Sequence, residues 1–382
     1  MRSLQIIGLI FLILFLLECI AIAQSFEHKG QLSGWVTTHF NDISETQSGV
    51  RYIPEFMFQN QISDDYLFDA IGALNIMGSG LFNEGEAKDW EAFVKPYRAW
   101  IRVSGAQFEA RAGLQKINFG SATLLRPLRW FDQIDPRDPL QLTDGVYGLL
   151  FRYYFLNNTN IWLWGLAGRN KIKGWESLPS DSENPEYGGR IQVPLLTGEI
   201  ALSYHHRQID LTRHPLYSIL AFDDSCEEHR VGLDGKWDIG IGIWFEGSLV
   251  YQDFDFTQRR YQRLFTLGSD YTFDIGQGLH ILGEHFVAQT AKQALGSGEG
   301  ISISALSLNL PFGLIDNLTG ILYYDWDNEE WYRFISWQRT YDKWQFILNA
   351  FWNPDQYQIN QGEQDQNLFG GKGFQVMAVF NY

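Results

Sequence analysis

Apolar and polar residues alternate with a period of two along most of the chain after residue 30. Over 344–352 the even-numbered positions are all apolar. Over 93–103 one face would carry Phe93, Lys95, Tyr97, Ala99, Ile101 and Val103. Such alternation predicts β-strands with one face in an apolar medium and the other against something polar. Helical periodicity is scarce, so we predict an all-β fold.

About 18 runs of this kind can be counted, and 16 is the alternative count. Most are about 9–13 residues long, which is the length that a tilted strand needs to cross a bilayer. The expected strands are 30–41, 50–62, 65–78, 90–104, 106–118, 146–156, 159–170, 187–195, 198–209, 228–238, 240–253, 262–274, 278–290, 300–311, 317–326, 331–341, 343–353 and 372–382.

The connections between these runs alternate in length. Short turns separate longer polar loops, which we expect at 42–49, 79–89, 119–145, 171–186, 210–227, 254–261, 291–299, 327–330 and 354–371. Long loops at one end only are typical of a transmembrane antiparallel β-barrel, with short periplasmic turns and long extracellular loops. The alternative is a secreted soluble β protein, such as a propeller or a jelly roll.

The first residues predict export. A basic start, an aliphatic run over 6–17 and the small residues Ala21 and Ala23 are typical of a signal peptide over 1–23. The rest, 24–382, would then form a single barrel domain. We expect no helical membrane span after the signal, because no later stretch of about 18 apolar residues occurs.

Composition narrows the class of protein further. Lys and Arg total 29 against 45 Asp and Glu, a net charge of -16, which argues against a nucleic-acid partner. Two Cys exclude a disulfide scaffold. The 14 Trp and 18 Tyr suit the aromatic belts of a membrane barrel.

The export signal, the strand-and-loop rhythm and the aromatic last residue resemble Gram-negative outer-membrane porins. In that family a terminal aromatic on an alternating strand is the signal for the barrel-assembly machinery, which the resemblance assigns here to Phe380 and Tyr382. The run from Arg111 to Gln115 also resembles an Arg-x-Gly-Arg-Gln strand of alginate-export and related porin-like proteins, with Leu114 in place of the second Arg.

If the apolar face of each strand meets lipid, the opposite face lines the lumen. The predicted pore-lining residues are Arg98, Arg102, Glu109, Arg111, Arg152, Arg190, Arg207, Arg230 and Lys236. Rows of Arg and Lys select anions in pores, so this wall would attract anionic solutes. The alternative is that each Arg pairs with a neighbouring acid and serves stability.

The third long loop, 119–145, is stiffened by three prolines and carries alternating Arg and Asp. In porins the third loop often folds into the channel, so the resemblance implies a constriction. The residues expected there are Arg126, Arg129, Asp132, Asp135, Arg137 and Asp138. The alternative is a lid packed on the outer rim.

The resulting hypothesis is a channel in the cell outer membrane for passive or facilitated diffusion of small polar, in particular anionic, solutes. Export or uptake of a polysaccharide or an anionic oligosaccharide is an alternative, as is a structural or adhesin barrel; an outer-membrane enzyme is a weaker one. Expected partners are outer-membrane lipid, lipopolysaccharide, the barrel-assembly machinery and, in a homotrimer, further copies. We expect no cofactor and no metal, since adjacent His205 and His206 point to opposite faces of a strand.

Overall fold

The computed structural model describes residues 25–382 except 41, 84–85, 170, 220–222, 255–256 and 355–368, and only the backbone of 42–45. The expected signal peptide lies outside the described residues. The strands are β1 (Ser25–His39), β2 (Asp42–Ser63), β3 (Tyr66–Asn83), β4 (Glu86–Ser104), β5 (Phe108–Gln115), β6 (Val146–Tyr154), β7 (Asn160–Leu166), β8 (Glu186–Leu195), β9 (Gly198–Asp210), β10 (Ser225–Asp238), β11 (Gly242–Gln252), β12 (Tyr261–Phe273), β13 (Leu279–Ala291), β14 (Gly298–Phe312), β15 (Asp316–Asp325), β16 (Glu330–Thr340), β17 (Trp344–Trp352) and β18 (Lys372–Asn381).

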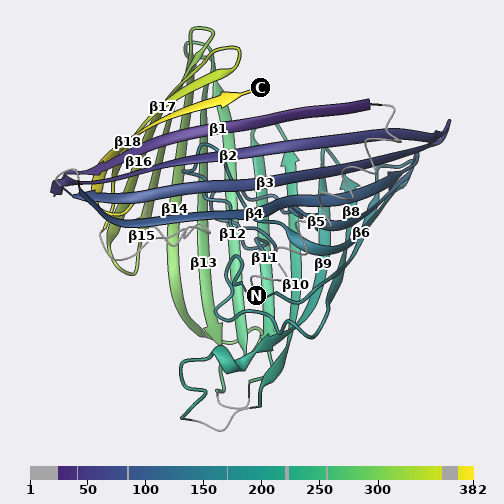
Figure 1. Ribbon diagram of the computed structural model, residues 1–382. Coiled ribbons are helices and arrows are strands. Elements are labelled where there is room, and N and C mark those ends of the chain that lie inside the picture. The colour runs from purple at the N-terminus through teal and green to yellow at the C-terminus, as the bar shows by residue number, and fades with distance from the viewer. Residues whose placement is uncertain are drawn as a thin grey trace.

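These strands form one 18-stranded sheet in which each strand pairs with the next along the chain. The sheet closes because β1 also pairs with β18, from Gln31 opposite Asn381 to His39 opposite Gly373. Figure 1 shows the two ends of the sheet meeting, where purple β1 runs beside yellow β18. Every pairing is antiparallel, so the predicted all-β antiparallel barrel and the count of 18 strands are confirmed.

Helical structure is confined, among the described residues, to one short 3-10 turn, η1 (Leu211–Arg213), in the connection between β9 and β10. None of the described residues belongs to a helix long and apolar enough to cross a membrane.

The outer surface carries the apolar face of the strands. On β17, Trp344, Leu348 and Trp352 are each between 43 and 48 % exposed, whereas the alternate residues Ile347 and Asn349 are buried. The two tryptophans bracket the strand at the levels expected of interfacial aromatic belts, and Leu348 lies between them. This outer face is suited to contact with lipid.

Two expected loops are wrong. Residues 42–49 and 79–89 belong largely to β2, β3 and β4. Only two residues separate β1 from β2, and only two separate β3 from β4. Backbone pairing, such as that of Val36 with Ser48, continues beyond the apolar belt. The polar residues there are therefore strand residues of long hairpins and not loop residues.

The predicted face of 93–103 is also wrong, because β4 contains a β-bulge. Ala73 pairs with Arg98 but Leu74 pairs with Pro96, so Tyr97 is an extra residue. An extra residue reverses the in–out phase of the strand. Lys95, expected on the apolar side, therefore points inward.

We predict that Leu348→Arg lowers the free energy of unfolding in lipid vesicles by about 2–4 kcal/mol, because it places a guanidinium at the bilayer midplane. Urea titration of the refolded protein would measure this. The control is Leu314→Arg, since Leu314 is 99 % exposed in the turn between β14 and β15. Equal losses for the two variants would contradict the assignment of the lipid-facing surface.

Candidate functional site

The long segment 119–145, between β5 and β6, contacts strands all around the barrel. Its Asp144 accepts a bond from Lys95 of β4 at 2.6 Å. Its Leu140 packs on a cluster that includes Trp35 of β1 and Met377 of β18. On the far side the backbone N–H of Leu125 reaches β13. A segment that touches opposite walls of a closed barrel runs through its interior, so these contacts place 119–145 inside.

Two buried carboxylates of the barrel wall hold the backbone of this segment. Glu284 of β13 accepts the N–H groups of Thr123, Leu124 and Leu125 at 2.7–2.9 Å. Glu246 of β11 accepts those of Ala122 at 2.8 Å and Leu128 at 2.6 Å. Oxygens of the two buried carboxyl groups thus accept five backbone N–H groups, and these five bonds anchor the segment to the wall.

Gly120 shows how closely the segment approaches this anchor. Its φ is +109°, and a Cβ built on it would lie 2.3 Å from a carboxylate oxygen of Glu246. Only glycine accommodates both the backbone angle and the contact.

Within the segment the predicted Arg and Asp residues largely pair with one another. Arg126 lies 2.8 Å from Asp132, and Arg137 lies 2.8 Å from Asp135. Burial opposes the charge of both guanidinium groups, yet the partner carboxylate raises the pKa of each above its ordinary value. These pairs hold the turns of the segment together.

Arg129 and Asp138 lie in the same segment, in different surroundings. Burial lowers the pKa of Arg129, whose guanidinium stands 5.4 Å from the ring centroid of Trp175. Burial raises the pKa of the Asp138 carboxyl, which accepts the N–H groups of Leu140 at 3.0 Å and Leu142 at 3.2 Å. Asp138 therefore supports a local turn.

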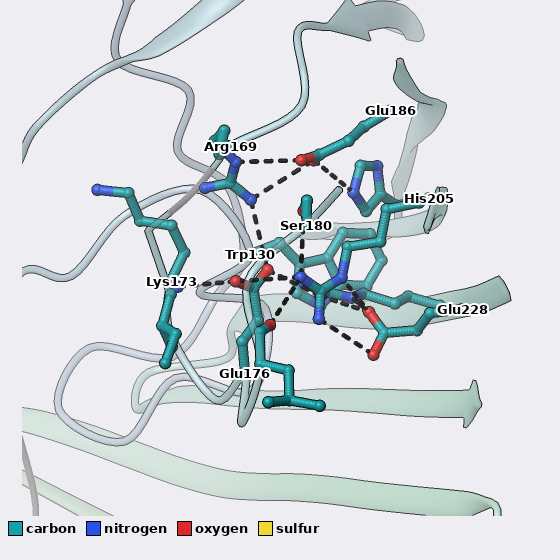
Figure 2. A network of polar contacts seen from close by, with 12 residues as sticks. Trp130, Arg169, Lys173, Glu176, Ser180, Glu186, His205 and Glu228 are labelled. Carbon is teal, nitrogen blue, oxygen red and sulfur yellow. Dashed lines mark hydrogen bonds and ion pairs between the residues drawn. The ribbon is translucent and has the colours of Figure 1, made fainter. Parts of the chain in front are cut away.

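A second inward segment, between β7 and β8, is held by a buried network of ions (Figure 2). Glu176 of this segment lies 3.4 Å from Arg207 of β9 and 2.8 Å from Arg230 of β10. Glu228 of β10 lies 2.5 Å from each of the same two arginines. Arg207 and Arg230 are at most 3 % exposed, so both predicted pore-lining cations are enclosed in ion pairs.

The same network extends to Glu186 of the neighbouring strand β8. This carboxylate lies 3.3 Å from Arg169 and 3.2 Å from the buried ring of His205. Next to it, Arg190 is paired with Asp234 at 2.6 Å and is 5 % exposed. Lys236 lies 5.0 Å from the ring centroid of Trp244.

Three of the predicted arginines gather on the inner wall near the turn between β4 and β5. Arg102, Arg111 and Arg152 each lie 3.2–3.4 Å from a single carboxylate, Glu109. Arg102 also pairs with Asp69 of β3 at 2.8 Å. Three cations thus face two anions, a net charge of +1. Their side chains are 15–28 % exposed, so solvent reaches this group, which we call the arginine cluster.

Two tryptophans support the arginine cluster. The guanidinium of Arg111 lies 4.5 Å from the ring centroid of Trp100, and that of Arg152 lies 3.7 Å from Trp162. Rings at this distance stabilise a cation without neutralising its charge. Arg98, higher on β4, instead donates to the carbonyl of Thr143 in the inner segment at 3.1 Å.

The opposite half of the interior is apolar. Buried side chains from β11 to β17, among them Leu264, Phe286 and Phe334, pack on Leu124 and Leu125 of segment 119–145. Alternation alone predicts polar residues at these inward positions. They are apolar because the inner segment, and not water, covers them.

Sequence reasoning missed the anchoring carboxylates Glu246 and Glu284. Each is the single acid on the inward face of its strand: Glu284 lies between Leu282 and Phe286, and Glu246 lies between Trp244 and Ser248. That pattern is a usable signal, since a single buried carboxylate requires donors from outside its own strand.

The predicted assembly residues lie at the seam of the barrel. The backbone N–H of Tyr382 donates to the carbonyl of Gly30 at 3.1 Å, and its ring hydroxyl lies 2.5 Å from that of Tyr52. Phe380 stands on Trp344 with ring centroids 4.8 Å apart. Their role as a signal stays a prediction.

We predict that Glu284→Ala loosens segment 119–145, because three backbone N–H groups and the indole of Trp244 lose their acceptor. Leaving buried donors unpaired costs about 1–3 kcal/mol, so amide exchange at 123–125 should accelerate on the order of tenfold. Hydrogen exchange with mass spectrometry would measure it. Glu299→Ala, at a residue whose side chain is 75 % exposed, is the control; unchanged exchange in Glu284→Ala would refute the anchor.

Comparison with known proteins supports the fold. No family model matches the sequence, and no curated protein matches it either. Among solved structures, Salmonella typhi OmpF in complex with daunomycin is 10 % identical, with 94 % of this chain and 97 % of that chain covered and a TM-score of 0.48. OmpT, an outer membrane protein of Vibrio cholerae solved in its trimer form, is 9 % identical, with 94 % and 99 % covered and a TM-score of 0.51. The likeness to OmpT shows that this chain has the porin-type β-barrel fold of Gram-negative outer-membrane proteins.

Proposed function

We propose that this protein is an outer-membrane channel for the passive diffusion of small polar solutes. The observation that carries the proposal is the closed barrel whose outer face is apolar and whose inner wall bears a solvent-accessible arginine cluster. A closed sheet satisfies its own backbone in lipid. Inward polar side chains then replace the hydrocarbon barrier with a hydrated path.

Anions are the preferred solutes in this proposal. Arg190, Arg207 and Arg230 are enclosed by acids, so they contribute little field to the lumen. Arg102, Arg111 and Arg152 share too few carboxylates for neutrality and remain partly exposed. Charged side chains at the wall of a pore select ions of the opposite sign, so the arginine cluster supports anion preference.

Segment 119–145 would act as the constriction of the channel. It is anchored to the apolar half of the wall through Glu246 and Glu284, and it reaches the basic half through Asp144. The remaining path would then run along β4 to β7, beside the arginine cluster. The predicted residues Arg126, Asp132, Arg137 and Asp135 would set its shape by bracing the segment rather than by meeting the solute.

An anionic oligosaccharide is a second candidate solute, because Trp100 and Trp162 lie beside the arginines. Aromatic faces stack on sugar rings while guanidinium groups pair with carboxylates. The arginine cluster reaches solvent and is not fully neutralised, so we favour a channel over a structural or adhesin barrel and over an enzyme.

We further propose the partners that the membrane location implies. Lipopolysaccharide would contact the outer rim, and the barrel-assembly machinery would read the strand that ends in Phe380 and Tyr382. The OmpT structure is of a trimer form, and a homotrimer is our proposal for this chain as well.

We expect the triple variant Arg102→Gln, Arg111→Gln, Arg152→Gln to lower the anion-to-cation permeability ratio about two- to tenfold, since wall charges concentrate counter-ions. Reversal potentials in planar bilayers across a salt gradient would measure the ratio. Arg213→Gln, in η1 and 66 % exposed, is the control. Cation preference in the unmodified protein would refute the anion proposal, and the absence of discrete channels would refute the channel itself.

Thr123→Trp should lower the single-channel conductance, because Thr123 is an exposed side chain on the anchored part of the inner segment. The larger indole would reduce the open space inside the barrel that Thr123 faces. Thr212→Trp makes the same exchange in η1, and there the conductance should not change. If both variants conduct as the unmodified protein does, segment 119–145 is not the constriction.

A further inference from the structure

Three potential metal ligands meet on the outer face of β9 and β10. The register pairs His206 of β9 directly with His229 of β10, and Glu227 lies two residues before His229 on the same face. One ligand atom from each of His206, Glu227 and His229 lies within 4.8 Å of the others. Directly opposite residues on antiparallel strands have Cβ atoms about 4.5–5.5 Å apart, which lets two imidazoles share an ion.

The adjacent His205 does not belong to this group. Its ring points into the barrel, 3.2 Å from Glu186 and 3.1 Å from the indole nitrogen of Trp164. His205 and His206 therefore point to opposite faces of β9, and their rings do not share an ion. A site formed across two strands is a different case, because only the register reveals the pairing of His206 with His229.

His229 is already oriented as a metal-bound imidazole would be. Its Nδ1 lies 2.9 Å from the hydroxyl of Tyr204, and its Nε2 lies 3.5 Å from Glu227. Metal-ligating imidazoles use one ring nitrogen for the ion and the other for an outer hydrogen-bond partner, which fixes the ring. Tyr204 occupies the position of that outer partner.

His206 carries a polar atom without a partner. It is 8 % exposed, and its Nδ1 is buried with no hydrogen bond. The ring is held between Tyr187, with centroids 4.8 Å apart, and His229, with centroids 4.9 Å apart. A buried imidazole nitrogen without a partner is rare in proteins, and a ligand at this position would satisfy it.

We propose that His206, His229 and Glu227 bind one Zn²⁺ ion on the outer wall of the barrel. Two imidazoles and a carboxylate are a common zinc set, and the fourth position would hold water. Tetrahedral Zn²⁺ with bonds of about 2.1 Å needs ligand atoms roughly 3.4 Å apart. Rotation of the Glu227 side chain, which is 60 % exposed, and small movements of the rings close the remaining gap.

The ion would join β9 to β10 beside the connection that protrudes at the bottom of Figure 1. Tyr187, Tyr204 and Tyr251 surround the group on the outer face. Rings of this kind mark the interface between membrane and water. The side chains of His229 and Glu227 are 36 % and 60 % exposed, so the group is accessible from outside the barrel.

The test is calorimetric titration of Zn²⁺ into the refolded full-length protein in detergent, after treatment with a chelator. We expect one Zn²⁺ per chain. His206→Gln and His229→Gln should each lower the affinity at least about tenfold, and Tyr204→Phe should lower it about tenfold through the lost outer partner. His285→Gln replaces another exposed histidine, on β13, and should leave the affinity unchanged.

Three titration results would overturn the proposal. The first is the absence of stoichiometric Zn²⁺ binding by the unmodified protein, the second is binding that survives both histidine substitutions, and the third is binding that is lost in Cys226→Ser. Electron paramagnetic resonance of Cu²⁺ on the unmodified protein is a check that needs no variant to fold. Coupling to two nitrogens supports the site, and a spectrum without nitrogen coupling refutes it.

Discussion

Closure of the sheet between β1 and β18 is the constraint on which the rest of the molecule depends. In a hydrocarbon environment an unpaired N–H or C=O group is too costly to keep, so an open edge is not tolerated. Once the seam is closed, each strand has one face toward lipid and one toward the interior. Every buried ion pair and every anchor described above follows from that separation.

The interior is divided rather than uniform. Segment 119–145 covers the apolar wall of β11 to β17, and its backbone is held there by Glu246 and Glu284. Near the outer rim, Arg207 and Arg230 pair with Glu176 and Glu228 and are neutralised. Removing one partner from such a buried pair leaves an uncompensated charge, which is costly. Most of the interior charges therefore serve to position segments. The electrostatic field in the lumen comes mainly from the arginine cluster, which is not fully neutralised.

The sequence was sufficient for the architecture because a period of two persists through most of the strands. It was insufficient where the phase changes. The extra residue Tyr97 reverses which side chains of β4 point inward. Nothing in the local composition reveals this bulge, so the inward direction of Lys95 could not be predicted. The polar stretches 42–49 and 79–89 read as loops because polarity alone does not reveal pairing beyond the membrane.

The candidate site was predictable in part. Arg102, Arg111 and Arg152 follow from strand phase, and Glu109 lies on the same face. Their shared carboxylate, and the enclosure of Arg207 by acids from another segment, depend on contacts between residues far apart in the chain. The same holds for His206 and His229, which are separated by a whole connection and meet only through register.

Within segment 119–145, Glu246 and Glu284 hold peptide groups, not side chains. Residues such as Thr123 can thus be exchanged without weakening the attachment of the polypeptide to the wall. Permeation properties and mechanical anchorage are then separable traits: descendants of this barrel can acquire new selectivity at the inner segment while inheriting its placement intact.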